Sequence, residues 1–548
     1  MNKATSALLT SCILILASQI CQAGSATWVQ SPADDNWSNP NNWMPNTVPN
    51  SSTDTATFGT SDTTAISIQD SIGLRSVIFQ PGASAYTLTV TNAKTLSLAG
   101  NPNIINNSGV EQNFVADGGL IAVYDNETLD STVHFDVLGN KIAQANSELS
   151  FAGGSAGTAR IDVEGSDDSR FPAGSAVFGT FSGAGSSTIV LHRGVNNGFS
   201  GQLIFNGGSA VAANITAEGA SERGRGGGHI YFSIDESAAT STITLQGPIA
   251  RGALGGILEF ELFTTASAST LIADGGSIIF HYESTGGTSR IILTHKGSLD
   301  ISDLSDLFTT EITIGSLEGD RTGNVFLGAK KLIVGSNNTS TVYSGVIQEG
   351  GIHGGMGGSL AKIGTRTLTL AGANLYTGGT TVSEGDFLVA NRAGSATGTG
   401  SVQVDAGRIG GAGTISGPLT IGTGSGSGAI LIPAAGTTRE VTTTIQSALT
   451  LKADATYNCA VSTMTAASDS VVANGVTIDP SATFVLHAKG NGTLSQGTVI
   501  TAINNTAATA IAGNFSGLSE GSTIVAGNNT YRVSYVGGDG NDFTLTVL

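Results

Sequence analysis

Residues 175–205 read SAVFGTFSGAGSSTIVLHRGVNNGFSGQLIF, and this stretch holds one complete unit of a repeat. A short apolar run ends in Phe178, a second apolar run follows at Ile189, and the next unit opens with the run that ends in Phe205. The phenylalanines that end such runs recur at intervals of 27, 27, 27, 28 and 20 residues: Phe151, Phe178, Phe205, Phe232, Phe260 and Phe280. An aliphatic residue follows each of them after ten or eleven positions: Ile161, Ile189, Ile215, Ile243, Leu271 and Ile291. A repeat of this length predicts stacked units that form one elongated body.

Each unit reads as a strand, a turn of small residues, a second strand and a longer glycine-rich turn, and helical periodicity is nearly absent. We therefore predict an all-β fold, an elongated right-handed parallel β-helix (β-solenoid) with an N-terminal β cap. Each strand would pair with its equivalent one coil away, about 4.8 Å along the axis. A β-propeller fits less well, because its blades need four strands and these units have two evident ones.

The composition narrows the class of protein. The 548 residues include 77 Gly but only 11 Pro, and the formal net charge is −18. An acidic surface repels phosphates, so we expect no nucleic acid as partner and no docking onto anionic lipid. The hydrophobic fraction of 39% is too high for a disordered chain.

The N-terminus has the features of an export signal. Lys3 supplies a positive charge, residues 8–17 are apolar but too few to span a bilayer, and Ala23 ends a small-residue cleavage site. We predict a signal peptide over residues 1–23 and no transmembrane segment after its cleavage. The expected address is extracellular or at the cell surface, with the periplasm as the alternative. Cleavage would leave Cys459 as the one thiol, which we expect to be buried, so disulfides cannot stabilise the fold.

Four regions follow the signal. All three tryptophans, Trp28, Trp37 and Trp43, lie in residues 24–105, which we interpret as an N-terminal β cap that hides the first unpaired edge. The same cluster could instead form a platform on which sugars stack. Beyond the cap, we expect a solenoid of about 27-residue repeats over 106–345, a denser repeat motif over 346–440, and a C-terminal β-rich region over 441–548.

The denser motif includes a strand pattern at 367–370 and two further strands at 380–382 and 387–389. Between them, Asn374 stands in a turn where it could accept a left-handed backbone. Gly378 and Gly379 would allow neighbouring coils to approach closely.

This motif resembles the autotransporter-associated β-strand repeat, which is found in secreted passenger domains of bacterial autotransporter-like proteins. The chain departs from the family pattern at Arg366, Leu375, Asp386 and Phe387. The resemblance implies a β-helical, secreted passenger. The matching positions are Leu360, Lys362, Gly364, Thr367, Leu368, Thr369, Leu370, Gly372, Ala373, Asn374, Tyr376, Thr377, Gly378, Gly379, Thr380, Thr381, Val382, Gly385, Leu388 and Val389.

Autotransporters end in a membrane β-barrel of strands that alternate apolar residues outward. The last hundred residues are too few for one and read as further soluble strands. We therefore expect a passenger-like protein without the C-terminal barrel, and a separate outer-membrane exporter is a candidate partner.

The segment GGDGND at 537–542 matches the start of a calcium-binding nonapeptide, which makes Asp539 and Asp542 weak metal candidates. Calcium rolls need tandem copies and this chain has one, so we expect a tight hairpin turn. We expect no other metal site and no cofactor.

Two further groups of polar residues are interpreted as surface features. Asp300, Asp303 and Asp306 lie three apart but favour a solvated turn between strands. The seven histidines have no helical zinc spacing, and His281 with Glu283 is read as a surface pair. No cluster of acids and bases is legible, so we predict no catalytic residues.

We therefore expect a secreted or cell-surface structural, adhesin-like solenoid without catalysis, with glycans or other surface proteins as partners. The alternative is a carbohydrate-binding or polysaccharide-degrading β-helix. Exposed aromatics and paired carboxylates along one face would favour the alternative, whereas ladders of Thr, Ser, Asn and Gly would favour the scaffold.

Overall fold

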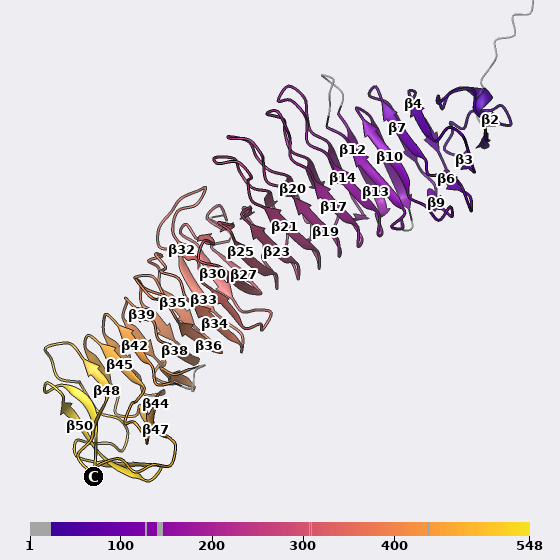
Figure 1. The fold of residues 1–548 in the computed structure, drawn as a ribbon. Coiled ribbons are helices and arrows are strands. Elements are labelled where there is room, and N and C mark those ends of the chain that lie inside the picture. Colours follow the sequence, from indigo (N-terminus) through magenta and orange to yellow (C-terminus); the bar gives the residue numbers. More distant parts are fainter. Residues whose placement is uncertain are drawn as a thin grey trace, which may run out of the picture.

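The fold was established from a computed structural model that describes residues 24–126, 129–139, 146–305, 307, 309–426, 428–435 and 439–548. It is an elongated all-β solenoid with the N-terminal strands at one end and the C-terminus at the other (Figure 1). The predicted signal peptide, residues 1–23, lies outside the described residues. Within them, no helix is long and apolar enough to cross a bilayer.

Three ladders of parallel strands run along the solenoid, and their rungs are successive coils of the chain. Ladder 1 extends over most of the length because each rung contributes a strand that pairs in register with the next. Its strands are β4 (Ala65–Ile68), β7 (Thr87–Thr91), β10 (Gln112–Asp117), β12 (Val133–Val137), β14 (Arg160–Val163), β17 (Thr188–Leu191), β19 (Asn214–Ala217), β21 (Thr242–Gln246), β23 (Thr270–Asp274), β25 (Arg290–Thr294), β28 (Ser316–Gly319), β31 (Thr341–Tyr343), β34 (Thr367–Leu370), β36 (Asp386–Val389), β38 (Gly407–Gly410), β41 (Ala429–Leu431), β44 (Ala455–Ser462) and β47 (Thr483–Lys489).

Ladder 2 covers the N-terminal half and carries the phenylalanines of the repeat. In it, the ring of Phe178 stacks between those of Phe151 and Phe205, with centroid separations of 4.9 and 5.3 Å. Its strands are β5 (Ile72–Leu74), β8 (Thr95–Leu98), β11 (Leu120–Asn126), β13 (Glu148–Ser155), β15 (Ser175–Phe178), β18 (Gln202–Phe205), β20 (His229–Phe232), β22 (Ile257–Phe260), β24 (Ser277–Phe280), β26 (Ser298–Asp300), β29 (Asn324–Phe326) and β32 (Val346–Gln348), and β16 (Ser182–Gly183) pairs beside β13.

Ladder 3 begins at β27, before the last two strands of ladder 2, and continues through the C-terminal part of the solenoid. All its pairings are parallel as well. Its strands are β27 (Glu311–Ile314), β30 (Lys331–Val334), β33 (Ser359–Lys362), β35 (Thr380–Val382), β37 (Val402–Val404), β40 (Leu419–Ile421), β43 (Leu449–Leu451) and β46 (Val476–Ile478).

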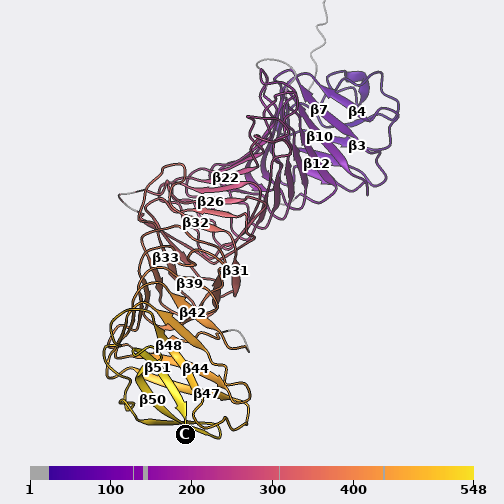
Figure 2. The same ribbon diagram turned by 60° about the vertical axis from the view of Figure 1, so that its left-hand side comes forward.

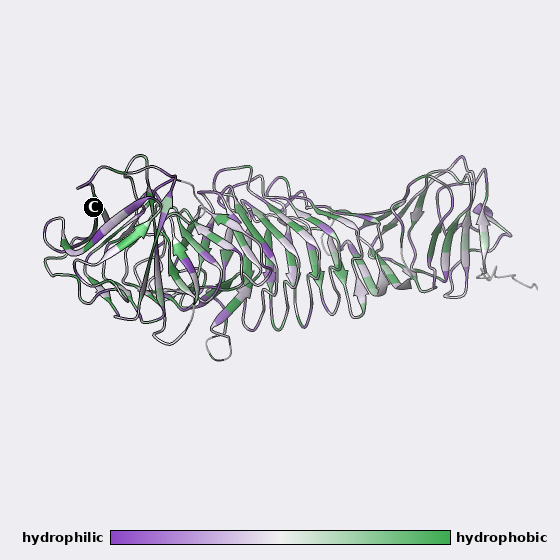
Figure 3. Cartoon of the chain, turned by 90° about the horizontal axis from the view of Figure 1, so that it is seen from below, coloured by the Kyte–Doolittle hydropathy of each residue, from purple (hydrophilic) through white to green (hydrophobic). Residues whose placement is uncertain are grey.

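The register confirms the predicted stacking of like residues. The aliphatic positions of the repeat lie opposite one another in ladder 1, as Ile189 does with Ile215, and both side chains are buried. Along strands such as β17 and β19, buried residues alternate with more exposed ones. Hydropathy coloring shows hydrophobic residues on strands along the whole length of the solenoid (Figure 3). The core is therefore one continuous column of apolar side chains along the axis.

The tryptophans form part of the N-terminal cap. Trp28, Trp37 and Trp43 are buried, and their rings pack edge-on against one another and on Phe58. Rings that lie inside the core cannot stack on a sugar, so the cap interpretation is confirmed and the sugar platform is wrong. The cap contains β1 (Ala26–Trp28), the 3₁₀ turn η1 (Pro40–Asn42), β2 (Trp43–Met44), β3 (Thr55–Phe58), β6 (Ser76–Phe79) and β9 (Ile104–Asn106).

The C-terminal end changes from parallel to antiparallel pairing. A fourth sheet starts with parallel strands β39 (Thr414–Ile415), β42 (Thr442–Ile445), β45 (Ser470–Ala473) and β48 (Val499–Asn505). It ends with the antiparallel strands β51 (Asp542–Val547), β50 (Asn529–Gly537) and β49 (Thr523–Ala526), which lie near the C-terminus in Figure 2. This hairpin covers the last parallel rung.

The turn that leads from ladder 2 to ladder 1 repeats its backbone from rung to rung. A stacked row of single residues runs through it, including Ser209, Ser237 and Thr265. Residues with a left-handed backbone lie before and after this row in the chain. The residue two positions after each member of the row has a φ angle of 47–63°. At Gly185 a Cβ atom would lie 2.5 Å from the carbonyl oxygen of Gly157, so this position also requires the close approach that only glycine allows.

Candidate functional site

The parallel register brings histidines and carboxylates from different rungs together on the outer surface. They form two groups, which we name after their central carboxylates. The Glu259 cluster consists of His229, Glu259, Glu261, His281, Asp303 and His353. The Asp162 cluster consists of His134, Asp136, Arg160, Asp162, Glu164, His192 and Glu218.

The strands of ladder 2 position the Glu259 cluster. Glu259 points outward from β22 because its neighbors Leu258 and Phe260 face the core. The ring of Phe260 stacks on that of Phe280 with centroids 4.8 Å apart, which holds the two rungs at a fixed spacing. His281 directly follows β24 on the second of these rungs, so it lies over the carboxylates of the first.

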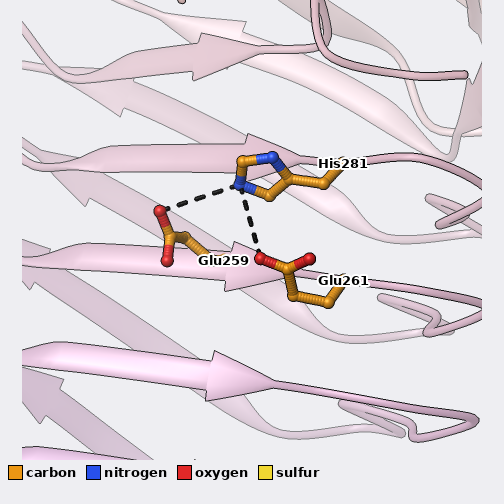
Figure 4. A group of neighbouring side chains, drawn as sticks. All are labelled: Glu259, Glu261 and His281. Carbon is orange, nitrogen blue, oxygen red and sulfur yellow. Dashed lines mark ion pairs between the residues drawn. The ribbon is translucent and has the colours of Figure 1, made fainter.

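Both ring nitrogens of His281 face carboxylates, and Figure 4 shows the one that faces Glu259 and Glu261. Its Nδ1 lies 2.6 Å from an oxygen of Asp303. Its Nε2 lies 3.7 Å from Glu259 Oε1 and 4.0 Å from Glu261 Oε1, and this nitrogen is buried without a hydrogen-bond partner. The other oxygen of Glu259 lies 2.8 Å from Nε2 of His229. The three residues Glu259, Glu261 and His281 each offer a ligand atom within 4.8 Å of the others, which makes them the candidate metal site.

Charge is shared strongly across this cluster. Burial opposes ionization of Glu259, but the hydrogen bond with His229 and the nearby imidazole of His281 outweigh it and lower the pKa of Glu259 to about 2. Burial likewise opposes charge on His281, but the nearby carboxylate of Glu259 and the hydrogen bond with Asp303 outweigh it and raise the pKa of His281 to about 9. The cluster therefore favors a positive charge at the position between the carboxylates.

The Asp162 cluster lies on ladder 1. Asp162 Oδ2 lies 2.8 Å from His134 Nε2 and 2.7 Å from Arg160 Nε, and Asp162 Oδ1 lies 3.1 Å from His192 Nε2. Asp136 is directly opposite Asp162 in the register of β12 and β14, so two carboxylates lie side by side on neighboring strands.

The two carboxylates differ in acidity. Burial opposes ionization of Asp162, but hydrogen bonds from His134 and His192 hold its pKa well below 3.8. Burial raises the pKa of Asp136, and one of its oxygens is buried without a hydrogen-bond partner. A neighboring pair whose pKa values are driven apart is an arrangement that suits an acid and a base.

Neither cluster was found from the sequence. Spacing along a single strand pairs His281 with Glu283, whereas the structure gives His281 partners on adjacent rungs. His229 and Glu259 are separated by 30 residues, and His281 and Asp303 by 22, which exceed the rung lengths of 28 and 21 residues by two and one positions. Adding one repeat length to each histidine position is the signal that could have found these partners.

The calcium candidates lie in a hairpin. Gly537 pairs with Asp542 across the turn between β50 and β51, and the Gly540 N–H donates to the Gly537 carbonyl, as a tight turn requires. Asp539 is exposed at the tip of the turn. Asp542 is buried, and its Oδ1 accepts a hydrogen bond from the backbone N–H of Asn505, which ties it to the fold.

The aspartates at 300–306 have separate surroundings. Asp300 accepts hydrogen bonds from the backbone N–H groups of Ser302 and Ile352. Asp303 belongs to the Glu259 cluster, and Asp306 lies outside the described residues. Cys459 is buried in β44, as expected, and burial raises its thiol pKa to about 12.

A row of apolar side chains is exposed at the turn that follows ladder 2. Phe181 and Phe263 occupy equivalent positions, two residues before the stacked row of that turn, and are 89% and 61% exposed, while Gly207 and Asp235 take this position on the two rungs between them. Tyr282 lies in the same turn of the next rung and is also exposed. All three have left-handed backbones, with φ of 61°, 59° and 49°. We call these three residues the aromatic turn row.

The motif residues at 360–389 hold neighboring coils together. Lys362 is buried, and its Nζ donates to the carbonyl oxygens of Ile363, Gly364 and Glu384, while burial lowers its pKa to about 8. The buried ammonium group of Lys362 can stay charged because these carbonyl oxygens accept its hydrogen bonds.

The expectation that Asn374 has a left-handed backbone is wrong, because its φ angle is not positive. Its buried side chain accepts from the N–H of Ile347 and donates to the carbonyl of Ala396, so it links three successive rungs. At Gly378 a Cβ would lie 2.1 Å from the carbonyl oxygen of Gly357, which confirms the predicted close approach.

Comparisons with known proteins bear on the same stretch. Residues 360–389 match the family model described as passenger-associated-transport-repeat. No curated protein sequence matches the chain. Among solved structures, the chain is similar to the crystal structure of the Haemophilus influenzae Hap adhesin, with 10% sequence identity and a TM-score of 0.24, over 90% of this chain and 64% of that one. The match thus spans less than two thirds of the Hap adhesin. In agreement with the resemblance, the stretch that matches the passenger-associated-transport-repeat model is built into an all-β parallel solenoid.

Proposed function

We propose that this protein is an exported, cell-surface solenoid of the autotransporter-passenger type that makes adhesin-like contacts and performs no catalysis. The passenger-associated-transport repeat supports the exported, passenger-type part of this proposal. The continuous ladders support a role as a long scaffold, because a solenoid presents its turns along an extended surface.

The aromatic turn row carries the adhesive part of the proposal. A bulky residue with a left-handed backbone is strained, and an exposed aromatic ring gains little from the folded core in return. Phe181 and Phe263 combine both features at equivalent turn positions. Exposed apolar side chains that recur along one edge are typical of surfaces that contact other molecules.

The outer face of ladder 3 supports the scaffold role of the C-terminal half. One row of that face is polar and uncharged, and each of its members lies opposite the next in register. Its members are Thr381, Gln403, Thr420, Thr450 and Thr477. Such a ladder of hydroxyl and amide groups offers neither acid nor base.

Surface location is tested on intact cells of the native host. Protease added outside the cells should digest the protein, whereas a periplasmic marker should survive. Protection of the protein until the outer membrane is opened would contradict surface display.

Adhesion is tested with non-adherent cells that display the chain and are washed over a host-cell layer. The triple variant Phe181→Ser, Phe263→Ser and Tyr282→Ser should be displayed at the normal level but lose most of the adhesion. A control variant, Val342→Ser, removes an exposed apolar side chain outside the row and should adhere normally. Unchanged adhesion by the triple variant would contradict the assignment of the row.

The second candidate function is glycan binding or cleavage, and one observation favors it. Asp136 and Asp162 lie opposite each other with pKa values shifted in opposite directions, as in a carboxylate pair that cleaves glycosidic bonds. The purified protein would be incubated with a panel of polysaccharides and assayed for new reducing ends. Release that disappears in Asp136→Asn would support this candidate, and the absence of release would favor the scaffold.

A further inference from the structure

We propose that Glu259, Glu261 and His281 bind one divalent transition-metal ion of the zinc type, which joins two neighboring rungs of the solenoid. This departs from the expectation, based on sequence, that the chain holds no such metal. The proposal is independent of the proposed adhesive function.

The spacing of the donor atoms suits an ion. The distances of 3.7 and 4.0 Å from His281 Nε2 to the two glutamate oxygens are too long for hydrogen bonds. Ligand atoms that each lie about 2.0–2.2 Å from a shared zinc ion in a tetrahedral site are roughly 3.3–3.6 Å apart. The two distances from His281 Nε2 therefore need to shorten by only about half an ångström or less for the three atoms, which all lie within 4.8 Å of one another, to share an ion.

The buried nitrogen supplies a second observation. His281 Nε2 has almost no contact with solvent and no hydrogen-bond partner, and the imidazole as a whole is only 12% exposed. Buried polar atoms in native proteins are nearly always satisfied. An ion between His281 and the two carboxylates would satisfy this atom directly.

Neighboring groups orient the ligands. His281 Nδ1 is held by Asp303, whose other oxygen lies 3.2 Å from Nδ1 of His353. The second oxygen of Glu259 is held by His229. A histidine whose far nitrogen is fixed by a carboxylate is the usual support of a metal ligand. Each ligand thus keeps its free atom directed at the same point.

The backbone around the ligands is rigid. Glu259 lies on β22, whereas Glu261 and His281 directly follow the ends of β22 and β24. The backbone N–H groups of Glu261 and His281 still donate to carbonyls of the preceding rungs, so the ladder pairing holds these two positions as well. Ligands on or next to regular strands are positioned more accurately than ligands on loops. With three protein ligands, zinc keeps a fourth position for water or for an oxygen of another molecule.

The test measures binding and stability with zinc chloride as the probe. The purified full-length protein, freed of metal by a chelator, should bind one Zn²⁺ per chain in a saturable titration. Its melting temperature should rise with added Zn²⁺, because an ion that binds only the folded state stabilizes it. In Glu261→Gln and in His281→Gln, the affinity for Zn²⁺ should fall by about tenfold or more. The rise in melting temperature at a given Zn²⁺ concentration should become smaller in both variants.

Controls separate this site from general effects. His295→Gln removes an exposed histidine that pairs with Asp274 outside the cluster and should bind Zn²⁺ as the parent does. Circular dichroism without metal should show that Glu261→Gln retains the fold, since this change keeps the size of the side chain. The proposal would be overturned if the parent showed no saturable Zn²⁺ binding, or if both ligand variants bound Zn²⁺ as tightly as the parent. It would also be overturned if His295→Gln lost as much Zn²⁺ affinity as the ligand variants do. Stabilization by Ca²⁺ but not by Zn²⁺ would overturn the choice of ion.

Discussion

The ring of Phe232 stacks on the ring of Phe205, with centroids 4.5 Å apart and planes inclined by only 9°. The two residues are one repeat apart in the chain and lie opposite each other in the register of β18 and β20. This separation is close to the spacing of neighboring strands in a sheet, so the rings and the backbone share one repeat distance. The sequence period therefore corresponds to one rung of the ladder.

Truncation of a stacked ring should weaken the solenoid locally. Phe205→Ala removes a fully buried ring and should cost about 3–5 kcal/mol of unfolding free energy. Chemical denaturation, with hydrogen exchange to locate the loss, would measure it. Ile204→Ala, the outward neighbor in the same strand, should cost clearly less because that side chain is only half buried. Equal costs for the two changes would contradict the assigned orientation of β18.

The tryptophans provide a direct report on the cap. The chain has three tryptophans and all are buried in the cap, so intrinsic fluorescence reports this region alone. Iodide should quench the native protein weakly. Trp43→Ala should leave Trp28 and Trp37 accessible to iodide, because they pack against the deleted ring. Strong quenching of the native protein would show that the rings face solvent, as a sugar platform requires.

Lys362 should be essential to the passenger-associated-transport repeat. Lys362→Ala leaves three carbonyl oxygens without their donor and should cost about 2–4 kcal/mol. The matched control is Lys331→Ala on the preceding rung of ladder 3, whose exposed ion pair with Glu311 should contribute less than about 1 kcal/mol. Thermal unfolding of both variants would measure the difference. A loss in the Lys362 variant no larger than in the control would refute the structural role.

The Asp162 cluster predicts a dependence of stability on pH. The hydrogen bond to Asp162 raises the pKa of His192 above its ordinary value. A raised pKa stabilizes the fold below the ordinary histidine pKa of 6.5, and this contribution is lost as the pH rises through the folded value. The charged groups that face His192 are Asp162, Glu164 and Glu218.

His192→Gln should therefore lower the unfolding free energy at pH 6 by about 1–2 kcal/mol and by much less at pH 9. Urea denaturation at the two pH values would measure this. His487→Gln, which changes an exposed histidine on β47, should have little effect at either pH. A loss for His192→Gln that is the same at both pH values would indicate packing rather than charge.

The sequence predicted the ladders because their residues repeat with the rung. The phenylalanines of ladder 2 and the aliphatic residues of ladder 1 recur once per rung and alternate with outward-facing neighbors. Their spacing therefore indicates both where each strand lies and which of its faces is buried. The cap was also predicted, since only a chain end needs a bulky aromatic cover.

The histidine clusters could not be predicted in the same way. The contact between His281 and Asp303 depends on a turn that shortens the rung, and turn lengths vary along the chain without an apolar pattern to mark them. The role of Asn374 was mistaken for a similar reason. An asparagine in a turn suggests a left-handed backbone, but its side chain instead bonds to the rungs before and after it, which a single repeat cannot reveal.

The parallel register itself is tested most directly by cysteine pairs on ladder 1. Thr188 lies opposite Asn214, and Asn214 lies opposite Thr242 on the following rung. Neighboring rungs are about 4.8 Å apart, within reach of a disulfide, whereas residues two rungs apart are beyond it. The one cysteine in the described part of the chain, Cys459, is buried. Thr188→Cys with Asn214→Cys should form a disulfide on mild oxidation, and Thr188→Cys with Thr242→Cys should not. Failure of the first pair, or equally ready formation of the second, would contradict the stacked parallel rungs.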